Sequence, residues 1–116
     1  VGILGKLGIN YIQQHSISDC KYERKLKFDA FDVDNNIAFE YNGEQHYRPV
    51  DWAGKGVDWA EQQFILTQNR DKAKIEYCKL HKIPIIIIPY WEKDNMESFI
   101  ISKLENIKEN KINNRA

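Results

Sequence analysis

The sequence is poor in the residues that define several common classes of small protein. It has only two cysteines, Cys20 and Cys78, so neither a disulfide-dense secreted scaffold nor a four-thiolate zinc site can form. The longest apolar run, Ile85 to Ile88, is far too short to cross a bilayer. Seventeen basic and 17 acidic residues give a formal net charge of zero, which excludes a uniformly cationic nucleic-acid coat. Any nucleic acid must therefore be bound through a local basic face or a bound cation.

The remaining composition is that of one folded domain. Hydrophobic residues make up 42% of the 116 residues, which is enough for a core. We expect a single domain over residues 1–116, with a frayed tail over 108–116. Because the chain starts at Val1 and not at Met, we expect it to be a piece excised from a longer protein. Two unpaired thiols and the lack of a signal peptide predict a cytoplasmic protein with no membrane partner.

Hydrophobic periodicity predicts an α/β domain with a mixed central sheet flanked by helices. The order is helix, strand, strand, helix, strand, helix, and a further short strand before the long helix is left open. The predicted elements are a helix over 4–14, strands over 21–33 and 37–41 joined by a turn at 34–36, a loop over 47–60, a helix over 61–81 broken near 67–69, a β-branched strand over 83–89, and a helix from 94 or 95 to about 110.

Two carboxylates lie on the predicted hairpin. A turn near Asn35 pairs residues whose numbers sum to about 70, so Asp29 should lie opposite Tyr41 and diagonal to Glu40. Carboxylates on neighbouring strands can share a hard divalent cation such as Mg²⁺. The alternative is that both acids face solvent, as acids on strands usually do.

His46 follows this hairpin and is the only histidine near the two acids. Its neighbours favour a role in proton transfer, whereas we interpret His15 and His81 as structural residues at helix ends. On the long helix, Asp71 shares a face with apolar residues and is therefore expected to point at the sheet. An equally weighted alternative is that Asp71 is an acid at a helix start, stabilised by the helix dipole.

Basic residues surround these positions and could hold phosphates: Lys27, Arg48, Arg70 and Lys72. Each one taken alone is more often a solvated charge. Trp52 lies in the long loop and could stack on bases or wedge between them. Its other interpretation is the commoner one, in which the ring pins the loop to the body of the domain.

Taken together, these segments resemble a PD-(D/E)XK nuclease domain. The resemblance is greatest to the branch related to very short patch repair (Vsr-like) endonucleases, which includes phage intron-encoded homing endonucleases with an EDxHD active site. It covers about Tyr22 to Tyr90 and rests on segments in a fixed order: LKFDAF (26–31), IAFEYNGEQHY (37–47), RDK (70–72), YC (77–78) and the strand leading to Tyr90.

The resemblance implies a restriction-endonuclease-like αβββαβ core and Mg²⁺-dependent hydrolysis of double-stranded DNA, with Mn²⁺ able to substitute. Carried over by position, Asp29 would bind the metal and Glu40 would sit beside it. His46 would activate water and Asp71 would orient that histidine. Homodimer formation is left open, a sequence-reading domain is expected outside this chain, and a phage source would place the protein in the host cytoplasm.

The chain also departs from the family pattern. Asn42 stands two residues after Glu40, where the family usually has a lysine. Gln45 and His46 would take the role of that lysine. The glutamate that the EDxHD branch carries on its first helix has no counterpart over 4–8, and Glu23 is a weak substitute. An inactive nuclease-fold module that binds DNA or a partner protein is therefore the alternative, followed by a purely structural domain.

Overall fold

A computed structural model of the chain describes the backbone of residues 2–22 and 24–113, and the side chains of residues 2–15 and 26–110. Glu23 and the side chain of Cys20 lie outside the described residues. The order of elements is α1, β1, β2, β3, α2, β4, α3, with one short 3-10 helix (η1) after β3 and another (η2) after β4.

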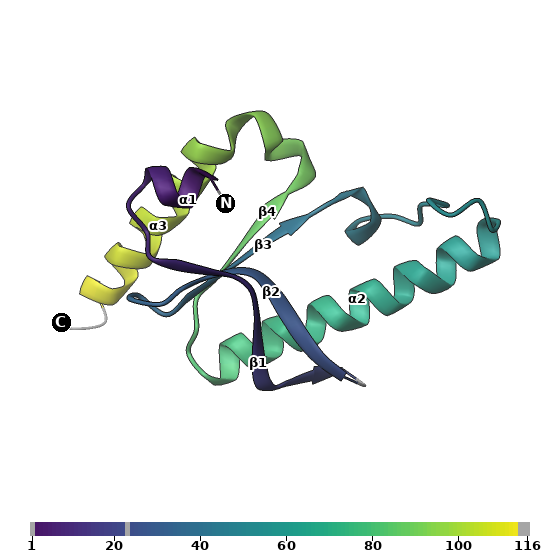
Figure 1. Cartoon of the computed structure of the whole chain (residues 1–116), viewed down its shortest axis with the longest axis horizontal. Helices are drawn as coiled ribbons and strands as arrows, with labels where there is room; N and C mark the ends of the chain where they lie inside the picture. The colour runs from purple at the N-terminus through teal and green to yellow at the C-terminus, as the bar shows by residue number, and fades with distance from the viewer. Residues whose placement is uncertain (1, 23, 114–116) are drawn as a thin grey trace.

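Four strands form one mixed sheet in the order β1–β2–β3–β4 (Figure 1). Their bounds are β1 Tyr11–Tyr22, β2 Arg24–Asp32, β3 Ile37–Asn42 and β4 Ile85–Pro89. The first three strands pair antiparallel, whereas β4 lies parallel to β3. A parallel neighbour requires a crossover connection, which the long helix α2 supplies.

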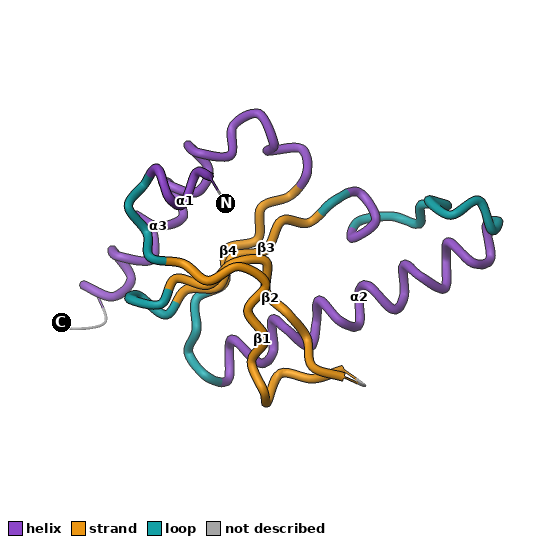
Figure 2. The backbone as a smooth tube through the Cα atoms, viewed as in Figure 1, coloured by secondary structure: helices purple, strands orange, loops and turns teal. Residues whose placement is uncertain are grey.

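Helices cover both faces of the sheet (Figure 2). One face carries α2 (Val57–Leu80), and the other carries α1 (Gly2–Lys6) and α3 (Met96–Asn113). At 24 residues α2 is about 36 Å long, so its first turns extend beyond the sheet together with the preceding loop (Figure 1). The predicted α/β class, a mixed sheet with helices on both sides, is confirmed.

The core is divided by the sheet into two apolar clusters. One cluster joins Phe28 and Ala38 of the sheet to Cys78 of α2. The other joins Phe39, Ile88 and further residues of the sheet to α1 and α3. The run of isoleucines in β4 supplies both clusters, because successive strand side chains point to opposite faces. A strand covered on both sides was predicted for this segment, and the structure confirms it.

The predicted helix over 4–14 is wrong beyond its first turn. The helix ends at Lys6, Gly8 follows with a φ of +73°, and β1 begins at Tyr11. Glycine adopts this left-handed conformation without steric cost, so the chain turns there and enters the sheet. His15 accordingly lies on a strand and packs on Phe31, with ring centroids 4.9 Å apart, and is not at a helix end.

Two further boundaries differ from the predictions. Helix α2 begins at Val57, not at residue 61, and runs unbroken through the predicted break near 67–69. The hairpin pairs Ala30 with Phe39, so its residue numbers sum to 69 and not 70. The C-terminal residues 108–113 are helical as part of α3, and residues 114–116 lie outside the described part.

Candidate functional site

The paired register between β2 and β3 extends as far as Ala30 and Phe39, and beyond it two carboxylates accept hydrogen bonds from the backbone. The Asp29 N–H donates to Glu40 Oε1 at 2.8 Å, and the Tyr41 N–H donates to Asp29 Oδ2 at 2.7 Å. Side-chain oxygens thus satisfy backbone donors that would otherwise lack a partner between diverging strands. Both acids are therefore held at the point where the strands separate, and Asp29 is hydrogen-bonded to the chain at both Glu40 and Tyr41.

Glu40 is also paired with a cation from α2. Lys74 Nζ lies 2.9 Å from Glu40 Oε2, and the two side chains are only 14% and 6% exposed. Burial raises the pKa of the Glu40 carboxyl above its ordinary value, and the charge of Asp29 adds to the increase, while Lys74 opposes it. A buried carboxylate needs such a partner, because an unpaired charge in the interior is costly.

His46 and Asp71 form the hydrogen-bonded pair that the sequence predicted. His46 Nδ1 lies 2.7 Å from Asp71 Oδ2, so α2 presents its acid to the 3-10 helix η1 (Glu44–His46) that follows β3. A carboxylate can only accept, so the neutral imidazole carries its proton on Nδ1 and keeps the lone pair on Nε2. This is the arrangement of a base whose tautomer is fixed by an orienting acid.

The turn into η1 depends on Gly43. A Cβ at this position would lie 2.7 Å from Gln45 Oε1, so a side chain there would displace Gln45. The His46 N–H donates to the Gly43 carbonyl, which completes the turn and fixes His46 directly behind the end of β3. The chain thus turns directly after β3 into η1, which carries His46.

A polar hollow of about 270 Å³ lies between η1, the loop after it and α2. Gln45, His46, Asp71, Arg70 and Trp52 line it together with Leu26, Gln63, Thr67 and Lys74. Of the predicted DNA-binding residues, Arg70 and Trp52 are therefore brought to the hollow. Three others are not among its lining residues: Lys27, Arg48, which is paired with Glu44, and Lys72, which lies 3.9 Å from Glu76.

Asp29 is connected to the other candidate residues but faces a different space. It lines a cavity of about 650 Å³ on the side of α1 and α3, with Gln13, Phe39 and Lys93 among its neighbours. Glu40, in contrast, lines a small hollow beneath α2 with Asp71 and Lys74. At the separation of the two strands, Asp29 thus lines a space on one face of the sheet and Glu40 a space on the other.

Sequence reasoning gave Lys74 no specific role beyond a generally basic helix and missed the environment of Asn42. Asn42 is buried, and its Oδ1 has no hydrogen-bond partner among the described residues. The amide group of the same side chain hydrogen bonds to Tyr47. Burial raises the pKa of Tyr47, and the nearby charge of Asp71 raises it to a smaller degree. Lys74 could have been found by its spacing, because it follows Arg70 by four residues and shares its helix face.

The acids at the strand separation suit one type of metal ion. Nowhere in residues 2–22 and 24–113 do three or more His, Cys, Asp or Glu side chains gather closely enough to hold a metal. Mg²⁺, however, is usually bound through one or two carboxylates, with water and substrate phosphates as its other ligands. The oxygen donors of Asp29 and Glu40 fit that pattern, and the unpartnered oxygen of Asn42 lies beside Glu40.

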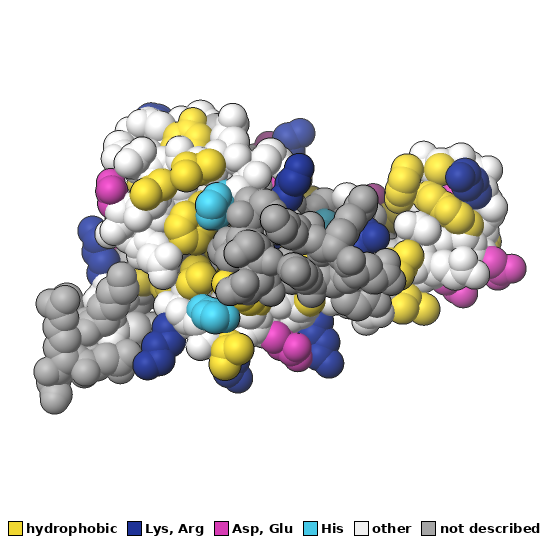
Figure 3. Space-filling model, turned by 60° about the horizontal axis from the view of Figure 1, so that its bottom comes forward, with side chains coloured by type: hydrophobic (Ala, Val, Ile, Leu, Met, Phe, Trp, Pro, Cys, Tyr) yellow, Lys and Arg dark blue, Asp and Glu magenta, His cyan; other side chains and the backbone are white. Residues whose placement is uncertain are grey.

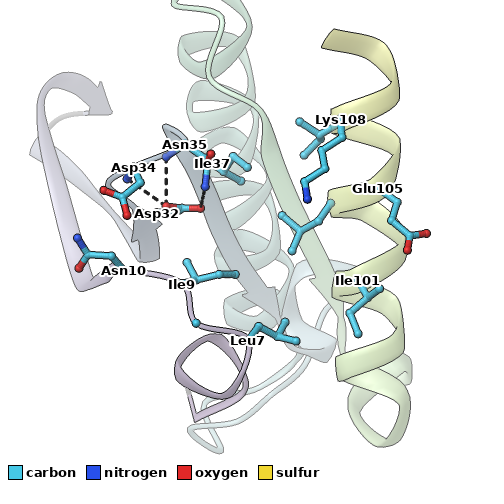
Figure 4. Close-up of a pocket in the computed structure, with 13 residues that line it drawn as sticks. Leu7, Ile9, Asn10, Asp32, Asp34, Asn35, Ile37, Ile101, Glu105 and Lys108 are labelled. Carbon is cyan, nitrogen blue, oxygen red and sulfur yellow. Dashed lines mark hydrogen bonds between the residues drawn. The ribbon is translucent and has the colours of Figure 1, made fainter. Parts of the chain in front are cut away.

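A second acidic cluster, at the hairpin turn, is structural (Figure 4). Asp32 accepts from the N–H groups of Asp34 and Asn35 and from the Asn35 side chain, at 2.9–3.2 Å. These bonds satisfy the turn that joins β2 to β3. The adjoining cavity of about 380 Å³ is lined largely by apolar residues of the segment after α1, of β3 and of α3, and holds no titratable pair comparable with His46 and Asp71 among the side chains that line it.

Comparison with known proteins gives two viral relatives. The chain is 30% identical over 83 residues to "Uncharacterized protein 033L" of Invertebrate iridescent virus 3, covering 71% of this chain. It is 29% identical over 80 residues to "Uncharacterized protein 307L" of Invertebrate iridescent virus 6, covering 69% of this chain. These matches span only 41% and 38% of the relatives' own lengths. No family model matches the chain. No solved structure matches it.

In the described part of the chain, no helix is long and apolar enough to span a membrane.

Proposed function

We propose that this domain is the Mg²⁺-dependent catalytic domain of a DNA endonuclease of the homing or repair type, with a restriction-endonuclease-like core. The observation that carries the proposal is the 2.7 Å bond between His46 and Asp71, because Asp71 shares a small hollow with Glu40, and Glu40 in turn accepts from the Asp29 N–H. An oriented base next to an oxygen-ligand pair is what hydrolysis of a phosphodiester requires.

In this mechanism the residues of the chain have separate tasks. Asp29 and Glu40 would hold Mg²⁺, or Mn²⁺ in its place, which when bound neutralises phosphate charge and favours ionisation of water. His46 Nε2 accepts the proton of the attacking water, and Asp71 keeps Nδ1 protonated and stabilises the imidazolium that forms. Gln45 and Arg70 line the hollow and bind the phosphodiester.

The element order supports the same assignment. Three strands, a crossover helix and a fourth strand parallel to the third follow α1, which is the αβββαβ order that the family resemblance implies. The two viral relatives are more than twice as long as the segments they share with this chain. We therefore place a sequence-reading domain in the part of the full protein outside this chain, and the reaction in the host cytoplasm. Homodimer formation belongs to the same proposal.

A catalytically inactive nuclease-fold module is the second candidate. The observation that favours it is the lack of any acid on α1 (Gly2–Lys6), where the resembled homing endonucleases carry a glutamate. Such a module would use the same hollow to bind DNA or a partner protein and leave it intact.

The proposal is tested by incubating supercoiled plasmid with the purified chain and Mg²⁺. We expect nicked or linear products that disappear with chelator, and a loss of products for Asp29→Asn and His46→Ala. His81→Ala is the matched control, because His81 is exposed at the end of α2, where its ring packs on Tyr77. Plasmid that is bound but left uncut would favour the inactive module.

A further inference from the structure

We infer that Lys74 is an internal counter-ion that occupies the cation site at Glu40 until a substrate phosphate attracts its ammonium group. In the structure the Glu40 carboxylate has a partner on each oxygen: the Asp29 N–H on Oε1 and Lys74 Nζ on Oε2. A divalent cation can gain the second oxygen only if Lys74 leaves it. The inference rests on the proposed function for the identity of the anion, but its cation part can be tested without cleavage.

The position of Lys74 allows this exchange. Its side chain lines both the small hollow around Glu40 and Asn42 and the larger hollow around His46 and Arg70. The ammonium therefore already borders the space in which the phosphodiester is proposed to bind. A long, flexible lysine side chain can move its charge between two such partners by rotating its outer torsions.

A purely structural ion pair would look different. Such a pair would serve to fix α2 on the sheet, yet buried pairs contribute little net stability over apolar residues of similar size. Beneath Glu40, however, Asn42 offers a buried oxygen without a partner among the described residues, and this oxygen borders the same small hollow. A position that already holds one cation and carries a further unpartnered acceptor oxygen suits cation exchange better than simple packing.

The consequence is that the binding of DNA and the binding of the metal ion are coupled. If phosphate removes Lys74 from Glu40, DNA tightens metal binding, and metal tightens DNA binding by the same factor. The free protein should then bind divalent cations weakly. It would form its metal site mainly when substrate is present, which limits cutting to engaged DNA.

The test uses Mn²⁺ alone as the probe, added to the whole chain without DNA, with free Mn²⁺ measured by electron paramagnetic resonance. Lys74→Gln removes the charge but keeps a donor for Glu40, and Lys74→Met removes both. We expect each variant to bind Mn²⁺ at least about tenfold more tightly than the wild type, because a positive charge close to the site is lost. Lys79→Met on the same helix should bind as the wild type does, and adding Glu40→Gln to Lys74→Gln should abolish the gain.

Folded Lys74 variants with unchanged or weaker Mn²⁺ affinity would overturn the inference. If neither variant folds, the wild type decides: a short DNA duplex must tighten Mn²⁺ binding, and an unchanged affinity would overturn the inference equally. Cleavage is measured separately. Tighter Mn²⁺ binding by Lys74→Gln together with a wild type that never cuts DNA would remove the proposed nuclease activity and leave the counter-ion role standing.

Discussion

At His46, one hydrogen bond decides which ring nitrogen can act as a base. Asp71 Oδ2 accepts from Nδ1 at 2.7 Å, so the free lone pair lies on Nε2. Asp71→Asn keeps the shape but can donate a proton, which allows the opposite tautomer. If the domain is a nuclease, we expect the single-turnover cleavage rate to fall by about 10²–10⁴-fold with little change in DNA affinity.

Asp94→Asn serves as the control for this substitution, because Asp94 is exposed in the 3-10 helix η2 (Tyr90–Asn95), far along the chain from the pair. A wild-type rate in Asp71→Asn would show that the 2.7 Å bond plays no part in proton transfer. A fall in DNA affinity without a fall in rate would instead make Asp71 a binding residue.

Glu40 gives a prediction about stability and pH. Burial raises its pKa above the ordinary value of 4.5, so the folded state binds a proton more tightly than the unfolded state. The contribution of Glu40 is therefore fully present below pH 4.5 and is lost as the pH rises through the raised pKa. Urea unfolding of wild type and Glu40→Gln across this range should show the wild type losing stability relative to the variant as the pH rises.

A difference that stays constant with pH would mean that the Glu40 carboxyl titrates alike in folded and unfolded chains. Glu61→Gln is a suitable control, since it removes a carboxyl group of the same kind at an exposed position of α2.

The sequence was sufficient to predict single acids and their neighbours, but not what completes the site. The pairing of His46 with Asp71 was predicted from the family resemblance, and the structure brings the two side chains within 2.7 Å. Lys74 could not be assigned to Glu40, because 34 residues separate them and only the crossover brings them together. Likewise, the hydrogen bonds of the Asp29 and Glu40 side chains to backbone N–H groups needed the structure, because they lie beyond the paired part of the hairpin.

At the scale of elements, local patterns succeeded where one face was strongly apolar. The isoleucines of β4 and the hairpin turn at Asp32–Asn36 were predictable, because burial and turn chemistry agree there. The first strand was missed, because the spacing of leucine and isoleucine over 4–12 fits a helix as well as a strand. Only the left-handed conformation of Gly8, seen in the structure, shows that the helix ends before it. The start of α2 was missed because it follows Gly54 and Gly56 and has no capping side chain before it to mark the first turn.

Asp51 holds the loop that leads into α2. Its carboxylate accepts from the N–H groups of Lys55 and Gly56, at 2.8 and 2.9 Å. Asp51→Ala should therefore lower the free energy of unfolding by about 1 kcal/mol, as removal of a capping side chain does. The packing of Trp52 on Trp59, with ring centroids 4.8 Å apart, should loosen as well. Urea unfolding followed by tryptophan fluorescence measures both effects.

Asp51→Asn keeps one acceptor oxygen and should lose less stability than Asp51→Ala. Equal stability of the wild type and Asp51→Ala would mean that water replaces the carboxylate without cost. In that case the loop would be held by the contact between Trp52 and Trp59 and by Lys55, whose ammonium lies 5.6 Å from the Trp59 ring.

The whole molecule is electrically neutral and elongated, with extents of 51 × 32 × 25 Å. Its projecting end, formed by the loop and the start of α2, shows hydrophobic side chains together with basic and acidic ones (Figure 3). Trp52, which is 65% exposed, and Val57 account for much of the apolar surface there. A neutral molecule with such a local surface can bind a polyanion only through a few contacts, which gives a measurable signature.

That signature is the dependence of DNA affinity on salt. Each phosphate contacted by a basic side chain contributes a slope of roughly −0.9 to the logarithm of affinity against that of salt concentration. Four predicted contacts, Lys27, Arg48, Arg70 and Lys72, give a total slope of about −4. Arg70→Ala should reduce the slope by about 1, and Lys79→Ala should leave it unchanged. Fluorescence anisotropy with a labelled duplex measures the slopes.

A comparison of Arg48→Ala with Arg70→Ala tests whether the position of a basic residue, and not only the number of basic residues, decides its contact with DNA. Because Glu44 already pairs with it, Arg48→Ala should change the slope less than Arg70→Ala, whose arginine lines the hollow beside His46. Equal effects of both substitutions would mean that DNA displaces Glu44 and that the contact surface extends around η1. A slope near zero for the wild type would remove DNA as the partner, since a phosphate backbone cannot be bound by these cations without releasing counterions. The hollow would then have to serve a partner protein.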